Sequence, residues 1–334
     1  MPRCLCAWPP LVNRRHCVKK KIIGAMMAAL LMGSAAQAEF PDKAIRIVVP
    51  FAAGGGVDTL ARPFAKELGE ILGQSIVVEN KASNTGQIGA IDVARSAADG
   101  YTLLLSSAAF GTTPAFYPQV PYDPIKDFSP VMIMAAAPQV LVASNKFKAE
   151  SLQDVLAQAK QSDKINFALS ASTGIQALAT AMLAKQGGVA FTKIPYKGAG
   201  AAFVDLISGE VDLMIDNPAS SLVHVRSGKL RLLATTGAKR MNILPDVPTV
   251  AETLPGFEAR NWFVLVAPAG TPPAVIDKLN AASRTALNTP AMKELLARDG
   301  VDLVANSPTQ ASEFLQAEAK KWGDLVKESN LQVQ

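Results

Sequence analysis

Cysteine and histidine are scarce in this chain of 334 residues. All three cysteines and one of the two histidines lie within the first 17 residues. A chain without that segment has no thiol, which excludes a disulfide framework, a cysteine nucleophile and a thiolate metal site. The remaining histidine, His224, lies among apolar residues, and a lone histidine of this kind is more often structural than catalytic.

The first forty residues have the organisation of a secretory signal peptide. Three lysines at 19–21 precede an apolar run at 22–32, and small residues follow as far as Ala38. This order of basic, apolar and small residues is typical of a cleaved signal, and the run is shorter than the about 20 apolar residues that span a bilayer. We expect cleavage after Ala38, a periplasmic product, and a translation start at Met1 or near Val18.

Removal of this segment also removes the excess of positive charge. Six of the 33 Lys and Arg residues, and none of the 28 Asp and Glu residues, lie within 1–38, so the formal charge falls from +5 to −1. The basic character therefore belongs to the targeting segment, and it gives no argument for nucleic-acid binding. Residues 39–334 contain no second long apolar run and are numerous enough for two domains.

Strand-like and helix-like segments alternate at the start of residues 39–334. Short apolar strands are predicted at 45–50, 75–79 and 101–106, and amphipathic helices lie between them. This βαβαβ rhythm predicts an α/β protein with a parallel, doubly wound sheet.

A second α/β unit follows, and two apolar segments near 138–143 and 262–267 cross between the units. We therefore expect two lobes joined by two crossing strands. The predicted division is a signal peptide at 1–38, lobe 1 at 39–141 plus 265–334, and lobe 2 at 142–264. The C-terminal part is predicted to be helical, at 273–288, 290–298 and 308–329.

The loop at 50–58 follows the first predicted strand and carries three glycines at 54–56. A strand end, a glycine turn and a helix start expose backbone N–H groups that attract an anion, and glycine lets a ligand approach the main chain. A tight turn without a ligand is the alternative. Asp58 or Thr59 is the predicted N-cap of the helix. The glycine spacing matches no dinucleotide or P-loop motif, so we expect no cofactor.

Other predicted strands also end in polar loops, which lie at 106–108, 170–174, 196–200 and 216–219. Ligands of open α/β sheets bind beyond the carboxyl ends of the strands. Two facing lobes would therefore enclose a cleft of N–H groups and hydroxyls, which suits a small carboxylate. Each loop alone is also explained as a polar connection.

Two charged residues in these loops have a structural and a functional interpretation. Asp216 would accept a hydrogen bond from a ligand amine or hydroxyl, or form an Asx-turn with the Asn-Pro that follows. Lys197 would pair with a ligand carboxylate, or it is a solvated or structural lysine. No HExxH, GxSxG or paired-carboxylate signature supports an enzyme.

A series of sequence runs in a fixed order is more specific than any single loop. They lie at 41–51, 77–81, 88–90, 99–103, 121–128, 195–200, 209–212, 228–231, 245–249, 255–258 and 267–272. Together these runs resemble the extracytoplasmic solute receptors of tripartite tricarboxylate transporters, also called Bug proteins. The resemblance covers nearly all of residues 39–334.

The resemblance implies a two-lobed, type II-like periplasmic binding fold that closes on its ligand like a flytrap. In that family a ligand carboxylate is held largely by main-chain N–H groups and ordered waters. The ligand-binding residues that the resemblance implies are Phe51, Ala52, Ala53, Gly54, Gly55, Ser106, Ser107, Ser170, Ser172, Thr173, Gly174 and Asp216. Asp216 would face the variable end of the ligand.

The sequence departs from the family pattern in two places. The segment 82–86 has fewer glycines than relatives carry there, and Ala177-Leu178 stands where His-Leu is usual. Both departures bear on specificity, so the resemblance does not identify the acid.

The function that the resemblance implies is capture of a small organic acid without catalysis. Dicarboxylates, tricarboxylates, acidic amino acids and aromatic acids all fit. The expected partners are membrane transporter subunits, with a sensor-kinase ectodomain as the alternative, and we expect a monomer that binds no nucleic acid. A secreted α/β enzyme that uses the same cleft is the other alternative.

Overall fold

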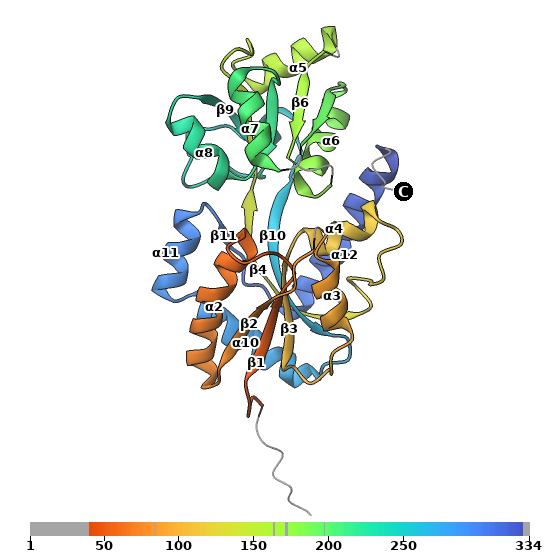
Figure 1. Ribbon diagram of the computed structural model, residues 1–334, viewed down its shortest axis with the longest axis vertical. Coiled ribbons are helices and arrows are strands. Elements are labelled where there is room, and N and C mark those ends of the chain that lie inside the picture. Colours follow the sequence, from red (N-terminus) through yellow and green to blue (C-terminus); the bar gives the residue numbers. More distant parts are fainter. Residues whose placement is uncertain (1–39, 84, 163, 171–172, 197, 330–334) are drawn as a thin grey trace, which may run out of the picture. The chain divides into compact units, whose positions relative to one another are not determined.

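The computed structural model describes residues 40–329, apart from positions 84, 163, 171, 172 and 197 (Figure 1). Residues 43–334 form one compact unit that is separate from residues 1–42. The predicted signal peptide and its cleavage site after Ala38 lie outside the described residues.

The first sheet, in the lower half of Figure 1, has the strand order β11-β4-β10-β3-β1-β2. Strands β1, β2 and β3 are parallel, whereas β10 runs antiparallel to both β3 and β4. Its strands are β1 (Ile45–Val49), β2 (Ile76–Asn80), β3 (Thr102–Ser107), β4 (Phe128–Pro138), β10 (Arg260–Pro268) and β11 (Asp302–Leu303). Its helices are α2 (Gly56–Leu72), α3 (Gln87–Ala94), α4 (Ala109–Phe116), α10 (Pro273–Leu287), α11 (Pro290–Arg298) and α12 (Pro308–Glu328).

The second sheet, in the upper half of Figure 1, has the order β7-β6-β8-β5-β9. Strand β6 is parallel to β7 and β8, and β5 is antiparallel to β8 and β9. Its strands are β5 (Val140–Ser144), β6 (Asn166–Leu169), β7 (Thr192–Pro195), β8 (Leu213–Asp216) and β9 (Leu230–Thr235). The helices of this part are α5 (Leu152–Gln161), α6 (Ile175–Gly187), α7 (Ala199–Ser208), α8 (Pro218–Arg226) and α9 (Val250–Thr253).

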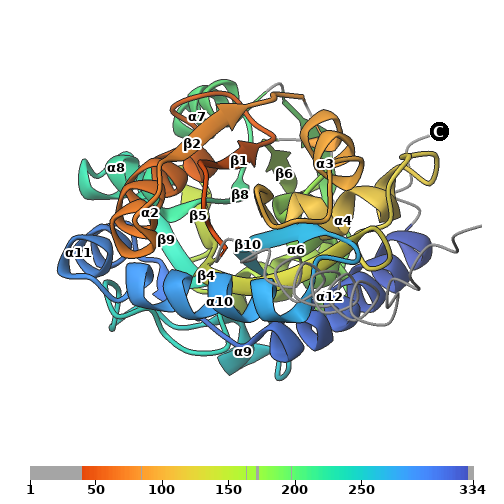
Figure 2. The same cartoon turned by 90° about the horizontal axis from the view of Figure 1, so that it is seen from below.

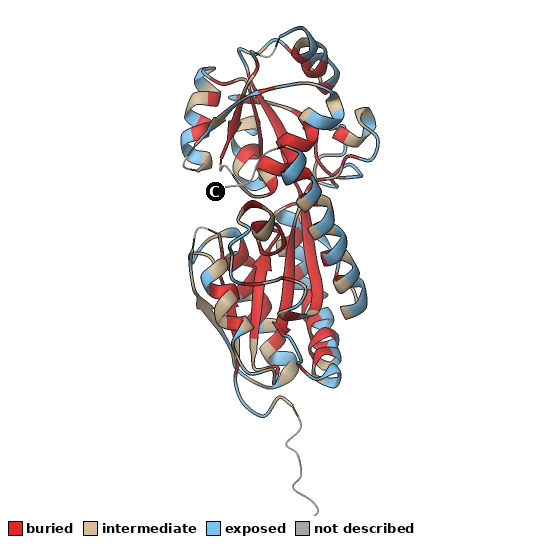
Figure 3. Cartoon of the chain, turned by 90° about the vertical axis from the view of Figure 1, so that its right-hand side faces the viewer, coloured by how far each residue is buried: buried red, intermediate tan, exposed pale blue. Residues whose placement is uncertain are grey.

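The central strands of both sheets are buried on both faces, as Figure 3 shows. Strands covered by helices on both faces read as continuous apolar runs, which is why the sequence pattern located them. Helix α12 joins the two cores. Ala311 and Leu315 near its start pack with the core of the first sheet, and Trp322, Leu325 and Val326 near its end pack with the core of the second.

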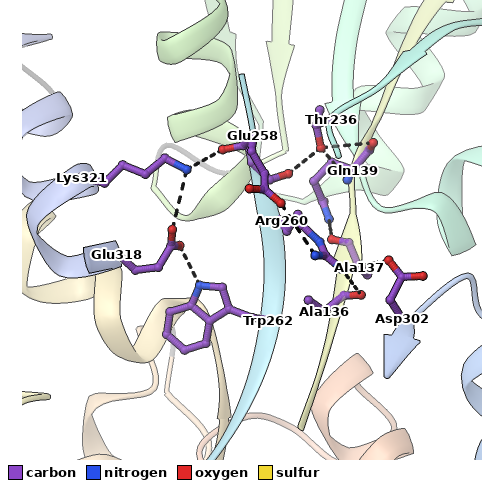
Figure 4. Close-up of polar contacts among 11 residues, drawn as sticks. Ala136, Ala137, Gln139, Thr236, Glu258, Arg260, Trp262, Asp302, Glu318 and Lys321 are labelled. Atoms are coloured by element: carbon purple, nitrogen blue, oxygen red, sulfur yellow. Dashed lines mark hydrogen bonds and ion pairs between the residues drawn. The ribbon is translucent and has the colours of Figure 1, made fainter. Parts of the chain in front are cut away.

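The two chain segments that cross between the sheets are joined by the Thr236 hydroxyl (Figure 4). Thr236 Oγ1 accepts a hydrogen bond from the backbone N–H of Gln139 at 2.7 Å and donates one to the carbonyl of Ala259 at 2.5 Å. Gln139 and Thr236 are fully buried. A buried hydroxyl that satisfies both crossing segments fixes their register, because an unpaired buried polar group is costly.

The carboxylate of Glu318 on α12 contacts side chains next to the crossing segment that continues as β10 (Figure 4). Glu318 Oε2 accepts hydrogen bonds from the indole nitrogens of Trp262 on β10, at 2.9 Å, and of Trp322, at 2.6 Å. Lys321 Nζ lies 3.7 Å from Glu318 Oε1 and donates to the carbonyl of Glu258 at 2.6 Å. These contacts attach α12 to the segment that leads into β10.

The predicted α/β fold is confirmed, with two corrections to its detail. The first sheet is mixed rather than wholly parallel, since β1, β2 and β3 are parallel as predicted but β10 returns antiparallel through it. The second sheet, for which no strand direction was predicted, is also mixed, because β5 lies antiparallel in it. The first helix begins at Gly56 with Gly55 as its N-cap, so Asp58 and Thr59 are not caps. The division into lobes at 39–141 plus 265–334 and 142–264 stays a prediction.

Candidate functional site

A cavity of about 610 Å³ lies between the carboxyl-end loops of the two sheets. It is lined by Phe51, Ala52, Gly55, Gly56, Val57, Thr59, Ser107, Ala137, Asn217, Pro218, Ala219, Ser220, Asn261, Phe263, Asp299 and Val301. Helices α2 and α8, which contribute to this lining, and α11, which ends just before the lining residue Asp299, lie on the left in Figures 1 and 2, and α4 and α12 lie on the right. The cavity volume is in the range of small-molecule sites.

Helix α2 directs its N-terminus at the cavity. Gly55 is its N-cap and receives no side-chain hydrogen bond, while Gly56 and Val57 occupy the first turn. The N–H groups of a first helical turn have no partner within the helix, and the helix dipole adds partial positive charge there. This end of the cavity wall therefore offers backbone donors.

Asp58 holds the loop that leads into α2. Its Oδ2 accepts the backbone N–H of Gly54 at 2.8 Å and Arg62 Nε at 2.9 Å, and its Oδ1 accepts Asn80 Nδ2 at 2.9 Å. Asn80 Nδ2 also donates to the carbonyl of Phe51 at 3.1 Å. Gly54 has φ +80°, a conformation that glycine adopts without strain.

The charge state of Asp58 follows from these contacts. Burial raises the pKa of the carboxyl, but hydrogen bonds from Arg62, Gly54 and Asn80 favour the ionised form and lower the pKa to about 2. Asp58 is therefore ionised at neutral pH, and it is a structural carboxylate because it is buried behind the loop.

Helix α8 supplies the opposite wall. Asn217 is its N-cap, without a side-chain capping bond, and Pro218 occupies the first turn, where a missing N–H costs nothing. Ala219 and Ser220 follow in that turn and line the cavity. The N-termini of α2, beside the first sheet, and of α8, beside the second sheet, therefore face the same cavity.

Asp216 lies immediately before α8 but does not line the cavity. Its Oδ1 accepts the hydroxyl of Ser170 at 3.2 Å, and its Oδ2 accepts that of Ser220 at 2.6 Å. Burial raises the pKa of this carboxyl, opposed by the two hydroxyls and the backbone N–H of Asn217. Through Ser220, Asp216 fixes a residue of the cavity wall.

Strand β10 brings side chains into the cavity floor. Asn261 pairs with Ala137 of β4, and Phe263 pairs with Ser107 of β3, so these four residues share one region of the first sheet. Asn261 Oδ1 accepts the backbone N–H of Ala108 at 3.4 Å. Among the described residues, the Ser107 hydroxyl and Asn261 Nδ2 have no hydrogen-bond partner, so both are available to a ligand.

The structure brings together only part of the predicted ligand-binding set. Phe51, Ala52, Gly55 and Ser107 line the cavity. The other predicted residues that the structure describes lie outside its lining, namely Ala53, Gly54, Ser106, Ser170, Thr173, Gly174 and Asp216. Ser172 and Lys197 lie outside the described residues. The contact of each predicted residue with a ligand stays a prediction.

The lining also contains residues that sequence reasoning missed. Ser220 lies one residue beyond the polar loop predicted at 216–219, which includes Asn217, and the proline at 218 is a helix-start signal that could have found it. Asn261 was detectable as a polar residue next to an apolar run. Asp299 follows a predicted helix far along the chain, and no local signal connects it with the first sheet.

Two general properties concern the described residues alone. No helix in 40–329, gaps excepted, is long and apolar enough to cross a membrane. Within the same part of the chain, no cluster of three or more His, Cys, Asp or Glu side chains has the arrangement of a metal site.

Comparisons with known proteins identify relatives over nearly the whole chain. The sequence model of the tripartite tricarboxylate transporter family receptor matches residues 60–331. Protein BugT of Bordetella pertussis is 39% identical over 313 residues, which cover 92% of this chain and 96% of that protein.

Solved structures extend the comparison to the fold. R. palustris Rpa4515 with adipate has a TM-score of 0.75 at 34% identity, covering 87% of this chain and 99% of that one. The periplasmic binding protein BugD has a TM-score of 0.73 at 33% identity, covering 88% and 100%. The predicted two-lobed fold of periplasmic binding proteins is therefore confirmed.

Proposed function

The chain belongs to the family of tripartite tricarboxylate transporter receptors, and from this membership we propose that it captures a small organic carboxylate between its lobes. The family consists of periplasmic solute receptors. We further propose that this chain is exported by a signal peptide cleaved after Ala38, and that it delivers its ligand to the membrane subunits of a tripartite tricarboxylate-type transporter.

The observation that carries the proposal is the donor-rich lining of the cavity. The N-termini of α2 and α8, the Ser107 hydroxyl and the Asn261 amide all offer hydrogen-bond donors, and no cationic side chain is among the described lining residues. Fixed donors replace the water that a carboxylate loses on burial, and hydrogen bonds to an ionised acceptor are stronger than neutral ones.

The apolar part of the lining fits the rest of such a ligand. Phe51, Val57, Pro218, Phe263 and Val301 surround the donors with hydrocarbon. A small acid would place its carboxylate on the donors and its carbon chain against these side chains. The relative Rpa4515 was solved with adipate, an acid of this shape, which supports the same class for this chain.

Thermal unfolding of the mature chain with a library of small acids tests the proposal. A ligand that binds only the folded state at 100 times its Kd contributes about 2.7 kcal/mol, which for a chain of this size corresponds to a rise in Tm of roughly 5 °C. Calorimetric titration then gives the Kd of each hit. If no acid raises Tm or releases heat, the proposed ligand class is wrong.

A pair of serine variants connects binding with the cavity. Ser107→Ala removes a donor from the lining and should weaken binding of a carboxylate about tenfold or more. Ser208→Ala is the matched control, because that hydroxyl is exposed on α7 and donates only to the carbonyl of Asp205. Equal affinities of the two variants would place the ligand elsewhere.

A further inference from the structure

The hydroxyl of Ser220, a lining residue of the cavity, has already used its only proton inside the protein. Ser220 Oγ donates to Oδ2 of Asp216 at 2.6 Å and to the carbonyl oxygen of Asn217 at 3.0 Å. A serine hydroxyl has one proton and two acceptor lone pairs, and a carbonyl oxygen can only accept. Towards a ligand, Ser220 Oγ therefore acts as a hydrogen-bond acceptor and not as a donor.

Asp216 fixes this polarity from behind the cavity wall. It is 2% exposed, does not line the cavity, and also accepts the hydroxyl of Ser170 at 3.2 Å. Hydrogen bonds in a poorly solvated place polarise one another, so a hydroxyl that donates to a buried carboxylate has an oxygen that accepts more strongly. Asp216 therefore influences a ligand through Ser220 without touching it.

The other uncharged polar side chains of the lining differ from Ser220. The Ser107 hydroxyl and Asn261 Nδ2 are free to donate, and the Asn217 amide carries both a donor and an acceptor. Thr59 Oγ1 donates to a backbone carbonyl at 3.1 Å and is also left as an acceptor, but Thr59 is exposed whereas Ser220 is half-buried. A hydrogen bond from a ligand is therefore worth more at Ser220 than at Thr59.

From these contacts we propose that Ser220 is a specificity-determining residue that accepts a hydrogen bond from a hydroxyl or ammonium group on the carbon chain of the ligand, with Asp216 as its positioning residue. A plain acid would cover Ser220 Oγ with hydrocarbon and leave its lone pair without a donor. The ligand class is thereby narrowed to hydroxy carboxylates and amino carboxylates. The proposal rests on the proposed function, since it assumes that a carboxylate occupies the donors of the cavity.

Acids that share one carbon skeleton test this preference by calorimetric titration. Succinate, malate, aspartate and methoxysuccinate form one series, and butyrate, 3-hydroxybutyrate, 3-aminobutyrate and 3-methoxybutyrate form a second. In the series that binds more tightly, the hydroxy or the amino acid should bind at least about fivefold more tightly than the plain acid. The methyl ether keeps the oxygen but has no proton to donate, so it should bind no more tightly than the plain acid. The order of the hydroxy and amino acids then identifies the donor.

Three variants assign the preference to Ser220. Ser220→Ala should reduce the affinity ratio between the preferred acid and the plain acid at least about threefold, while the affinity for the plain acid stays within about twofold. Asp216→Asn should lower the same ratio although Asp216 does not line the cavity. Thr59→Val removes the other hydroxyl acceptor of the lining and should keep the ratio. Ser208→Ala, at an exposed hydroxyl outside the cavity, is the matched control.

The outcomes separate this proposal from the proposed function. If the plain acid or the methyl ether binds as tightly as the hydroxy and amino acids, the selection by Ser220 is wrong while carboxylate binding stands. The same conclusion follows if Ser220→Ala keeps the ratio, or if the tightest acid of a larger library carries neither a hydroxyl nor an amino group. The comparison with the methyl ether in the wild type decides the matter even if Ser220→Ala does not fold. If no carboxylate of any kind binds, the proposed function itself fails.

Discussion

The loop before α2 should depend on the ionised form of Asp58. The Asp58→Asn substitution keeps the size of the side chain but removes the charge that accepts hydrogen bonds from Arg62 and from the backbone N–H of Gly54. We expect the variant to unfold at a lower denaturant concentration at neutral pH, and to lose its difference from the wild type as the pH falls.

The magnitude follows from the pKa of Asp58. Folding lowers this pKa from the ordinary value of 3.8 to about 2. Since the folded-state pKa is the lower one, the stabilisation is complete above the ordinary pKa and is lost as the pH falls through the folded-state pKa. Linkage gives a contribution of about 2 kcal/mol at pH 7 and about 1 kcal/mol at pH 3.

Urea unfolding at a series of pH values between 3 and 7 measures this difference. The free-energy difference between wild type and Asp58→Asn should shrink by about 1 kcal/mol over that range. Asp277→Asn is the matched control, because Asp277 is exposed on α10 and its carboxylate forms no hydrogen bond with the described residues. A difference between wild type and Asp58→Asn that does not change with pH would refute the reasoning.

Three further pairs of substitutions test packing and buried hydrogen bonds, each measured by urea unfolding. Gly89→Ala would place a Cβ 2.8 Å and 2.9 Å from two carbons of the proline after β1, and this overpacking should lower the free energy of unfolding by about 1–3 kcal/mol. Its control is Gly323→Ala in α12, where the added Cβ meets nothing within 4 Å and should raise the free energy of unfolding by up to about 1 kcal/mol. Thr236→Val leaves the Gln139 N–H unpaired and should cost about 1–3 kcal/mol, and an equal loss in Thr236→Ser would contradict this role for the hydroxyl. Glu318→Leu leaves two indole N–H groups without an acceptor and should cost about 3 kcal/mol, and Glu318→Gln, which keeps an oxygen there, should cost clearly less.

Local sequence signals predicted most of the secondary structure. The buried strands are continuous apolar runs, and helix starts such as Ser151 before α5 carry capping residues that bond as the pattern implies. The N-cap of α2 was predicted wrongly because the pattern cannot tell a capping aspartate from one in the first turn. Here Asp58 reaches back to Gly54, and Gly55 is the cap.

The candidate site was less predictable, because it depends on register between distant segments. The contribution of the loop after β1 follows from its glycines, and Phe51, Ala52 and Gly55 do line the cavity. The positions of Asn261 and Phe263 depend on the antiparallel return of β10, which places them opposite residues of β4 and β3. A pattern of apolar residues locates such a strand but does not give its neighbours or its direction.

Separating the lobes would expose different amounts of apolar surface on the two sides of the boundary between the sheets. On the side of α4, α6 and α12, Phe116 of α4 and Trp322 of α12 belong to one hydrophobic cluster with the core of the second sheet. Opening the molecule there would expose large apolar side chains, at about 25 cal/mol per Å² of apolar surface. On the side of α2, α8 and α11 the same boundary is a cavity, so opening there exposes little that is not already accessible. We therefore expect the lobes to exchange ligand on the α8 side, with the crossing at Thr236 and the packed end of α12 retained as the pivot.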